Sequence, residues 1–512
     1  MMNPITAVVV GPDVAAGWAA PVGSVGAPLI KFMRTVLLTT LVATVVGVTP
    51  VGATSDNPAW QTGQIVQLPT GATGLSQGYL PALSCPSAGN CVAAGAYSDA
   101  SGVVQALIAT ETAGQWANPR RLAPPSDAAT AANLTIVSLS CASMNECAMG
   151  GNYQDTKGDT QSFVAAKTAG VWSSAQKVIL PAGAATTGQV SSVRTVSCGV
   201  ARSCSAVGYY LDNTTPHART LGFTLSDSGS TWSSARSLTL PAGANFNPFV
   251  AVGQTVCATA NTCAAIGSYL DGENVARGLV MSRTGVTWST RTLVLSANAN
   301  AYPEASLSEL TCVSAGNCVA IGTFISTSGA IDGLTVTETR GVWGRAHAMV
   351  MPDDAAASPH VFFYGYGGVD CSSVGNCAAG GQYRDRAGAY QGFLLNEVHG
   401  TWRPATRLTL PGGANAAGRN GGVVAVTCRT NGTCSAGAAY LDAAGHYQAL
   451  LVNEVDANWL AGQKVALPGA ATTVGVAGGI YAVVCHASGP CTASGSYLDT
   501  SGRYQGFTVA GN

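Results

Sequence analysis

The chain has 512 residues and a net charge of −1, with 24 Lys and Arg residues against 25 Asp and Glu residues. Charged residues make up 10% of the sequence, whereas about a quarter of the residues are charged in a typical soluble protein. No basic stretch stands out, which argues against nucleic acid or an anionic membrane surface as a partner. The 63 glycines, with many Ala, Ser and Thr residues, favour strands and tight turns over amphipathic helices.

The N-terminal part has the features of a secretory signal. A charged segment precedes an apolar run that ends in Val-Gly-Ala at residues 51–53, a small-residue pattern typical of a cleavage site. The run is too short and too interrupted to span a membrane, so we expect a signal peptide over residues 33–53 and a secreted protein without a membrane span after cleavage. Residues 1–32 are either a non-native upstream extension, with translation starting at Met33, or an unusually long n-region.

All sixteen cysteines fall into eight pairs with the spacing Cys-x5-Cys. An even, strictly paired count behind a signal peptide predicts disulfides. No His or additional Cys accompanies the pairs at ligand spacing, which argues against metal sites, and nothing else in the sequence suggests a cofactor. The expected disulfides are Cys85–Cys91, Cys141–Cys147, Cys198–Cys204, Cys257–Cys263, Cys312–Cys318, Cys371–Cys377, Cys428–Cys434 and Cys485–Cys491.

The cysteine pairs mark a repeated unit of about 57 residues. One clear copy runs from Cys377 through Tyr383, Asp385 and Trp402 to Pro411. Its apolar runs have strand length and are bounded by Gly, Pro, Asn or Asp, and nothing has a helical period over a useful length. Strand a enters the first Cys, strand b leads from the second Cys to the Tyr, strand c follows an Asp-x-x-Gly turn, and strand d runs from the Trp to Leu-Pro. Four short strands at a fixed period predict the blades of a β-propeller.

The two ends of the repeat are complementary. The last unit stops at residue 512 without a Trp strand, and a Trp strand without a unit, residues 60–69, precedes the first Cys. We therefore expect residues 54–512 to form one all-β domain, an eight-bladed β-propeller of four-stranded blades with one hairpin disulfide per blade. The N-terminal strand should close the ring beside residues 504–509, which also hides a sheet edge. We expect this domain to be a monomer.

The unit resembles two known propeller repeats. Gly380-Gly381, followed by an aromatic residue, Trp and Leu-Pro, resembles kelch, and Asp-Ser-Gly-Ser-Thr-Trp at residues 227–232 resembles the core of an Asp box (BNR-like). Over about residues 60–512, the unit is also similar to a Cys-x5-Cys repeat of uncharacterised secreted proteins from high-G+C Gram-positive bacteria. These resemblances imply a propeller and a bacterial origin. Asp-box proteins include sialidases, whose site needs three converging arginines, but among the a strands only Arg194 supplies one.

Residues that recur in nearly every blade are explained by folding. The recurring Asp opens the turn between strands b and c, where its carboxylate can accept backbone N–H bonds; calcium ligation is the alternative. The recurring Trp is expected to pack between neighbouring blades. A residue that serves all blades alike does not define a unique site. The Asp positions are Asp99, Asp155, Asp212, Asp271, Asp385, Asp442 and Asp499.

The repeat breaks in the loop before the sixth cysteine pair, which is the longest crossover and is rich in aromatic residues. Exposed rings there could stack on sugars or anchor a peptide; the alternative is that two or three of them fill the channel or a gap between blades. A second set of tyrosines precedes a Gln in each of the last three blades, with cross-strand packing as its alternative. The candidate ligand-binding residues are Phe362, Phe363, Tyr364, Tyr366, Tyr390, Tyr447 and Tyr504.

The sequence offers no catalytic residues that we can name, which favours a protein that is not an enzyme. We expect a secreted binding or interaction module with carbohydrate or an extracellular protein surface as its ligand. One alternative is a glycoside hydrolase or lyase that acts on polysaccharide, with two carboxyl groups about 5–10 Å apart at the channel mouth. Another is a structural scaffold of the cell envelope.

Overall fold

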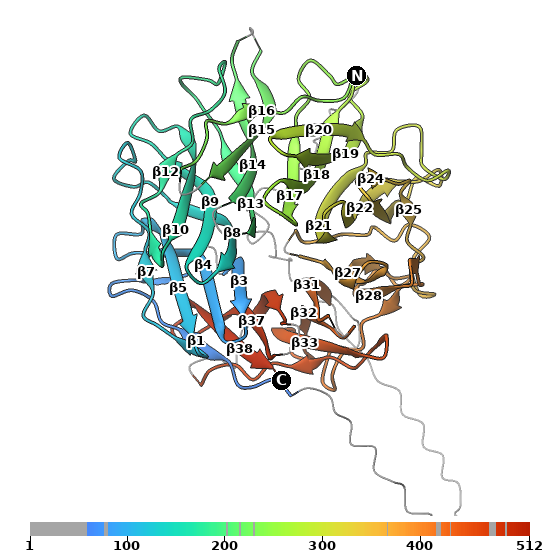
Figure 1. Ribbon diagram of the computed structural model, residues 1–512. Helices are drawn as coiled ribbons and strands as arrows, with labels where there is room; N and C mark the ends of the chain where they lie inside the picture. The colour runs from blue at the N-terminus through green and yellow to red at the C-terminus, as the bar shows by residue number, and fades with distance from the viewer. Residues whose placement is uncertain are drawn as a thin grey trace, which may run out of the picture. The chain divides into compact units, whose positions relative to one another are not determined.

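The computed structural model describes residues 59–511, except for residues 76–79, 201–202, 215–216, 229–230, 366, 416–420, 431, 470–477 and 487–488. The described part of the chain contains strands, turns and loops but no helix, hence none long and apolar enough to cross a membrane. Its strands form eight antiparallel sheets arranged around a common centre (Figure 1). The prediction of an all-β, eight-bladed propeller is confirmed. The expected signal peptide and upstream extension lie outside the described residues.

The first four blades follow each other in chain order. Blade 1 contains β2 (Gly74–Leu75), β3 (Ala82–Ser87), β4 (Asn90–Ser98), β5 (Val104–Thr112), β6 (Gln115–Trp116) and β7 (Arg120–Arg121). Blade 2 contains β8 (Thr135–Ser143), β9 (Glu146–Gln154), β10 (Thr160–Thr168), β11 (Val171–Trp172) and β12 (Gln176–Lys177). Blade 3 contains β13 (Ser192–Val200), β14 (Ser203–Asp212), β15 (Arg219–Ser228) and β16 (Arg236–Ser237). Blade 4 contains β17 (Ala251–Cys257), β18 (Thr262–Leu270), β19 (Ala276–Thr284) and β20 (Thr287–Thr292).

The other four blades complete the ring. Blade 5 contains β21 (Ser306–Ser314), β22 (Asn317–Ile325), β23 (Ile331–Thr339), β24 (Val342–Trp343) and β25 (His347–Ala348). Blade 6 contains β26 (Val369–Ser373), β27 (Asn376–Arg384), β28 (Tyr390–Val398), β29 (Thr401–Trp402) and β30 (Thr406–Arg407). Blade 7 contains β31 (Gly422–Cys428), β32 (Cys434–Leu441), β33 (Tyr447–Val455), β34 (Asn458–Trp459) and β35 (Gln463–Lys464). Blade 8 contains β36 (Gly479–Val484), β37 (Cys491–Leu498), β38 (Tyr504–Gly511) and β1 (Gln64–Val66).

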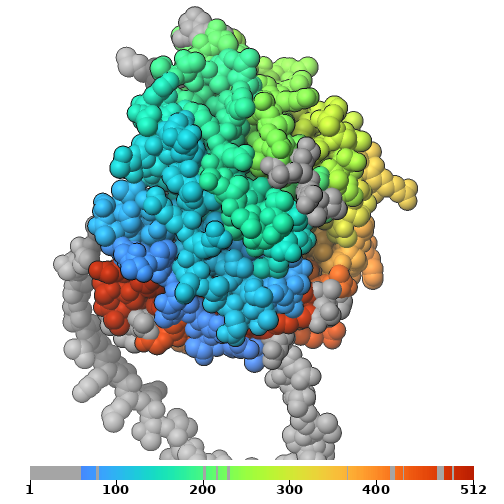
Figure 2. All heavy atoms as spheres, turned by 60° about the vertical axis from the view of Figure 1, so that its left-hand side comes forward, coloured from blue at the N-terminus to red at the C-terminus, as the bar shows by residue number. Residues whose placement is uncertain are grey.

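The N-terminal strand closes the ring as expected. β1 pairs antiparallel with β38, with Ile65 opposite Phe507, and Trp60 forms a further bridge to Gly511. In the space-filling view, the blue start of the propeller lies directly against its red end (Figure 2). The outer strand of blade 8 therefore comes from the opposite end of the chain, so that both ends of the repeat are held in one sheet.

All eight predicted disulfides are present, one in the hairpin of each blade. They join the two inner strands; in blade 3, for example, Cys198 lies opposite Cys204. The strands around them are rich in small residues, and at Gly151 the reason is steric, because a Cβ there would collide with the carbonyl oxygen of Thr135 on the neighbouring strand. The disulfides thus fix hairpins that present little large apolar surface.

The outer strands are shorter than the sequence suggests. In five blades the outer strand is split into two pieces of two residues, and only in blade 4 is it continuous, as β20. Blade 2 shows one cause of the break: the Ser173 hydroxyl accepts a hydrogen bond from the Ala166 N–H at 3.2 Å, so a side chain replaces a backbone acceptor. The wall of the propeller is therefore built from loops and short strands.

The two ends of each sheet form two different faces. At one end the Trp turn meets the disulfide hairpin, as where the Gly170 N–H donates to the Asn145 carbonyl at 3.1 Å. At the other end the crossover into a blade meets that blade's Asp turn, as where Ala184 bridges to Asp212. We call these ends the disulfide face and the crossover face.

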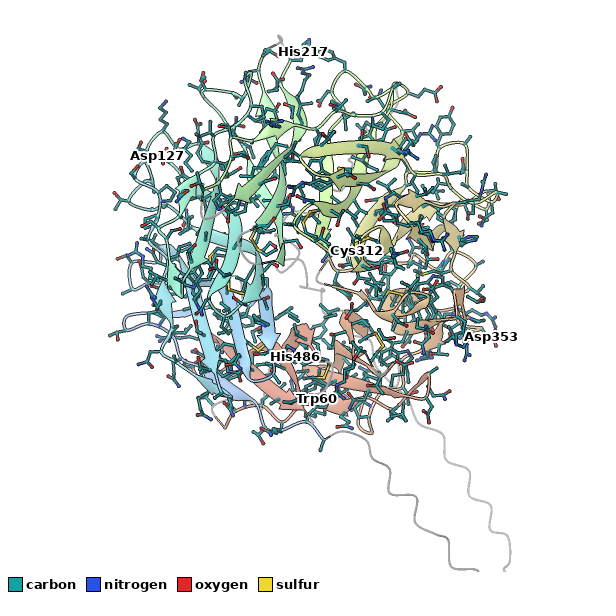
Figure 3. The ribbon with its side chains drawn as sticks, viewed as in Figure 1. Trp60, Asp127, His217, Cys312, Asp353 and His486 are labelled. Carbon is teal, nitrogen blue, oxygen red and sulfur yellow. A yellow bond between two sulfur atoms is a disulfide. The ribbon has the colours of Figure 1, made fainter. Side chains whose placement is uncertain are left out.

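Hydroxyl groups link neighbouring blades near the centre of the ring, where Figure 3 places Cys312. The residue before the first Cys of one blade accepts a hydrogen bond from the first Cys N–H of the next. Ser140 accepts from Cys198 at 3.0 Å, and Ser197 accepts from Cys257 at 2.9 Å. The Ser-Cys motif thus carries a contact between blades that the disulfide pattern alone does not reveal.

Candidate functional site

The aromatic crossover loop enters blade 6, and its rings divide between the core and the surface. Phe363 is 6% exposed and lies edge to face against Phe393, with ring centroids 6.1 Å apart. It belongs to the core of the blade together with Tyr383. Phe363 therefore cannot contact a ligand at the surface and we leave it out of the site, in keeping with the packing alternative. Tyr366 lies outside the described residues.

Phe362 and Tyr364 take the opposite orientation from Phe363. Both are half-buried, and their rings meet edge to face at 5.1 Å with an interplanar angle of 88°. The Tyr364 ring lies over Gly422, where strand β31 of the next blade begins. A Cβ at Gly422 would lie 2.9 Å from Cε2 of Tyr364, so glycine leaves the space that this ring occupies.

Two predicted tyrosines join Tyr364. Tyr390 begins β28 of blade 6 and is 38% exposed, and Tyr447 begins β33 of blade 7 and is half-buried. Burial raises the pKa of Tyr364, and the nearby phenols of Tyr447 and Tyr390 raise it further. The Tyr364 phenol thus lies within electrostatic range of the other two, although the three residues come from separate segments. We call Tyr364, Tyr390 and Tyr447 the tyrosine cluster.

Tyr504 lies apart from the cluster, at the start of β38 in blade 8, and sequence analysis missed its neighbour Tyr481. Burial raises the pKa of Tyr481, and Tyr504 raises it further. The register of β36 passes from Ile480 opposite Gly495 to Ala482 opposite Ser494, so Tyr481 is the extra residue of a β-bulge. A bulge redirects a side chain, and the sequence carries no clear sign of one.

The position that holds Tyr390 and Tyr447 holds smaller side chains in blades 1 to 5. The strand pairing aligns it, blade by blade, with Val104, Thr160, Thr220, Ala276 and Ile331. Only the last three blades carry an aromatic ring there. The protonated phenols of the cluster can donate and accept hydrogen bonds, and their rings offer apolar faces without adding charge.

The recurring Asp residues act within their turns, as predicted. In blade 6, Oδ1 of Asp385 accepts a hydrogen bond from the Ala389 N–H and Oδ2 accepts one from Nε2 of Gln391, both at 2.8 Å. Burial opposes ionisation of this carboxyl, but the hydrogen bonds from Gln391 and the turn outweigh burial and lower its pKa. Within the described residues, no group of three His, Cys, Asp or Glu side chains could hold a metal ion.

Two carboxylates on the inner strands bear on the hydrolase alternative. Glu309 is 1% exposed, and its Oε2 accepts a hydrogen bond from the Gly367 N–H at 2.8 Å. Asp370 accepts hydrogen bonds from the Cys428 N–H at 2.8 Å and the Thr311 hydroxyl at 3.0 Å, while burial raises its pKa. Both carboxylates thus connect blades 5, 6 and 7 to one another, which gives each of them a structural role.

The comparisons with known proteins add no family. No protein-family model matches the chain, and a search of curated proteins finds no match. Among solved structures, the chain is similar to a subtype N11 neuraminidase-like protein of A/flat-faced bat/Peru/033/2010 (H18N11), with a TM-score of 0.35, 10% identity and coverage of 89% of this chain and 94% of that one. It is also similar to a protein of unknown function from Dyadobacter fermentans DSM 18053, with a TM-score of 0.34, 13% identity and coverage of 62% and 93%.

A third similar structure is a Trypanosoma rangeli sialidase in complex with sialic acid, with a TM-score of 0.32, 9% identity and coverage of 66% of this chain and 55% of that one. At such TM-scores and identities we transfer no residue role from any of the three. Our description of the eight-bladed propeller, its disulfides and the tyrosine cluster therefore rests on the sequence and geometry of this protein alone.

Proposed function

We propose that this protein is an extracellular binding module whose crossover face binds carbohydrate through the tyrosine cluster at blades 6 and 7. The supporting observation is that Tyr364, Tyr390 and Tyr447 come together where the repeat departs from its pattern. Residues that maintain the fold recur in nearly every blade, whereas the combination of the aromatic crossover loop with these two tyrosines occurs once. Such a departure from the repeat is where a specific function is best sought.

The chemistry of the cluster suits a sugar ring. A pyranose has an apolar face of C–H groups that packs on an aromatic ring, and hydroxyl groups that exchange hydrogen bonds with phenols. Tyr390, at 38% exposure, is the most accessible ring of the three, and Phe362 supports Tyr364 from the side. The three side chains of the cluster are uncharged, although the exposed Arg384 lies opposite Tyr390 in the strand pairing, and a neutral saccharide is the ligand that we propose.

The eight disulfides fit the proposed location. Disulfides form and persist in oxidising compartments, and each of them here closes a hairpin within one blade. We propose on this basis, and on the signal-like residues 33–53, that the protein is exported.

A glycan array with the purified protein tests the proposal, followed by calorimetric titration with the best neutral oligosaccharide. We expect binding to weaken by about tenfold or more in the double variant Tyr390→Ala/Tyr447→Ala, because each stacked ring contributes about 1 kcal/mol. The matched control is Thr160→Ala/Thr220→Ala, which changes the same turn position in blades 2 and 3 and should leave the affinity unchanged.

Two results would contradict the proposal. One is that no neutral glycan binds to the array, in which case an extracellular protein surface becomes the ligand to test. The other is that the tyrosine variant and the threonine variant bind alike. Thermal unfolding of both variants shows whether any loss reflects the site and not the fold.

A further inference from the structure

The outer wall of the propeller is cationic although the chain as a whole is neutral. The eight outer segments that start at the Trp of each blade contain nine Lys or Arg residues and no Asp or Glu. All nine side chains are exposed. The segments are residues 60–68, 116–122, 172–180, 232–240, 288–295, 343–351, 402–410 and 459–467.

Two groups of acidic residues have structural roles outside the outer segments. Seven Asp residues cap the turns of the crossover face, as Asp385 does. Glu residues of the Trp turns are buried, for example Glu338 and Glu454 at 2% and 5% exposure. Lys177 and Arg407 are nevertheless paired with carboxylates, at 2.7 Å with Asp127 and at 2.9 Å with Asp354, so the wall keeps a smaller excess of positive charge.

Two of the nine cations meet at a groove between blades 6 and 7. The groove has a volume of about 270 Å³, near the lower end of ligand-binding clefts at about 300 Å³. Its lining includes Arg403, Thr406 and Arg407 of blade 6. Asn458 and Trp459 of blade 7 form the other side.

The two arginines of the groove differ in their partners. Arg407 is 46% exposed and pairs with Asp354 at 2.9 Å, from the same loop as Asp353, which lies near the outer rim in Figure 3. Within the described part of the chain, no carboxylate lies within ion-pair distance of Arg403. A guanidinium binds a carboxylate through two parallel hydrogen bonds, and Arg403 is free to do so.

The base of the groove is fixed by a hydrogen-bonded chain across the two blades. Nε1 of Trp459 donates to Oδ1 of Asn396 at 2.9 Å, and Nδ2 of Asn396 donates to the buried Glu454 at 2.7 Å. Because its N–H is already used, the half-buried indole can offer a ligand only its ring. An aromatic ring held beside two guanidinium groups, with threonine hydroxyls between, suits an acidic sugar.

We propose that this groove is a second binding site, and that it takes a uronate residue of an acidic polysaccharide whose chain continues along the cationic wall. A polymer with a carboxylate on each sugar matches a wall whose charges recur from blade to blade. The ring of the sugar would pack near Trp459 while its carboxylate meets Arg403 and Arg407. This inference is independent of the tyrosine cluster, which lies on the crossover face.

Titration of the purified protein with polygalacturonate tests this site, with neutral dextran as the uncharged control. We expect binding that weakens with salt, because the contact is ionic. Arg403→Ala/Arg407→Ala should weaken it by at least about tenfold, the loss of two charge-assisted contacts. The matched control Arg120→Ala/Arg121→Ala removes the same charge from the wall of blade 1 and should cost no more than about twofold.

Each outcome decides the matter. Equal losses in the two double variants would show a diffuse charge effect and overturn the groove. Tighter binding of double-stranded DNA than of polygalacturonate would overturn the saccharide as occupant. Absence of polygalacturonate binding would reject the site even if neutral glycans bind at the tyrosine cluster, so the two proposals fail separately. Since all four arginines are exposed, unfolding curves that match the parent exclude misfolding.

Discussion

We call the contact region between two neighbouring blades a seam. Two seams are built from the same parts, one between blades 6 and 7 and one between blades 4 and 5. Of these two, the first opens into a sizeable groove. In the second, Nε1 of Trp343 donates to the Ser282 hydroxyl at 3.1 Å, and Ser282 donates to the buried Glu338 at 2.7 Å. The same order of Trp, polar side chain and Glu appears in both. The cavity at the second seam is about 30 Å³, against about 270 Å³ at the first.

The difference follows from the outer strand. In blade 4 it is continuous, because Thr290 pairs in the ladder opposite Met281. In blade 6 the N–H of Ala405, three residues after the Trp, donates instead to the Val350 carbonyl of blade 5 at 2.8 Å, and the strand is broken into β29 and β30. The hydrogen-bonded chain between blades thus belongs to the fold, while the course of the outer strand beside it differs between the two seams.

The largest expected effect concerns the carboxyl groups in these seams. Burial raises the pKa of Glu454 to about 7 from 4.5 and raises that of Glu338 as well. A carboxyl with a raised pKa favours the folded state most while it is protonated, below about pH 4.5. As the pH rises from 4.5 through 7, Glu454 loses its proton in the folded protein. The free energy of unfolding should then fall by about 3 kcal/mol.

Denaturant unfolding from pH 3 to pH 8.5 would test this expectation. Hydrogen bonds that outweigh burial lower the pKa of the turn Asp residues, to about 2 for Asp499, so their contribution disappears as the pH falls below 3.8. Stability should therefore peak near pH 4 to 5. Glu454→Gln should flatten the alkaline side and leave the acidic side unchanged; an unaltered alkaline side would show that Glu454 is not the group responsible.

The next largest expected loss of stability comes from the polar residue in the middle of each hydrogen-bonded chain, Asn396 or Ser282. Asn396→Ala removes the donor to Glu454 and the acceptor of Trp459, and we expect a loss of about 2 kcal/mol at pH 8, because buried polar groups are left without partners. The loss should be smaller at pH 5, where Glu454 is protonated. Ser282→Ala at the other seam should cost about 1 kcal/mol. Equal losses at both seams would mean that the two hydrogen-bonded chains contribute equally to stability.

Sequence reasoning recovers what can be counted along the chain. The eight disulfides and the closure by β1 follow from spacing and from one spare Trp strand. The hydrogen bond from Trp459 to Asn396 joins residues that are 63 positions apart and lie in two blades. Neither residue can therefore be predicted from the other in the sequence. Periodicity also fails in loops: it does not tell that Phe363 joins the core of blade 6 while Tyr364 packs over Gly422 of blade 7, nor that a bulge displaces Tyr481.

The smallest effect would test whether Pro404 opens the groove. Pro404→Thr places at this point the residue that blade 4 has at Thr290, and it restores a backbone N–H to the outer strand. Because blades 2, 5 and 7 are split with Ser174, Arg345 and Ala461 at this position, we expect the strand to stay split and polygalacturonate binding to change by no more than about twofold.

Hydrogen exchange at residue 404 and its neighbours would show whether the strand has formed. Protection together with weaker binding would contradict this expectation and show that the proline alone opens the groove. Protection with unchanged binding would show that the guanidinium groups bind the ligand without the enclosed space. The seam between blades 4 and 5 would then differ because Ser289 stands in the place of Arg403, and not because its outer strand is continuous.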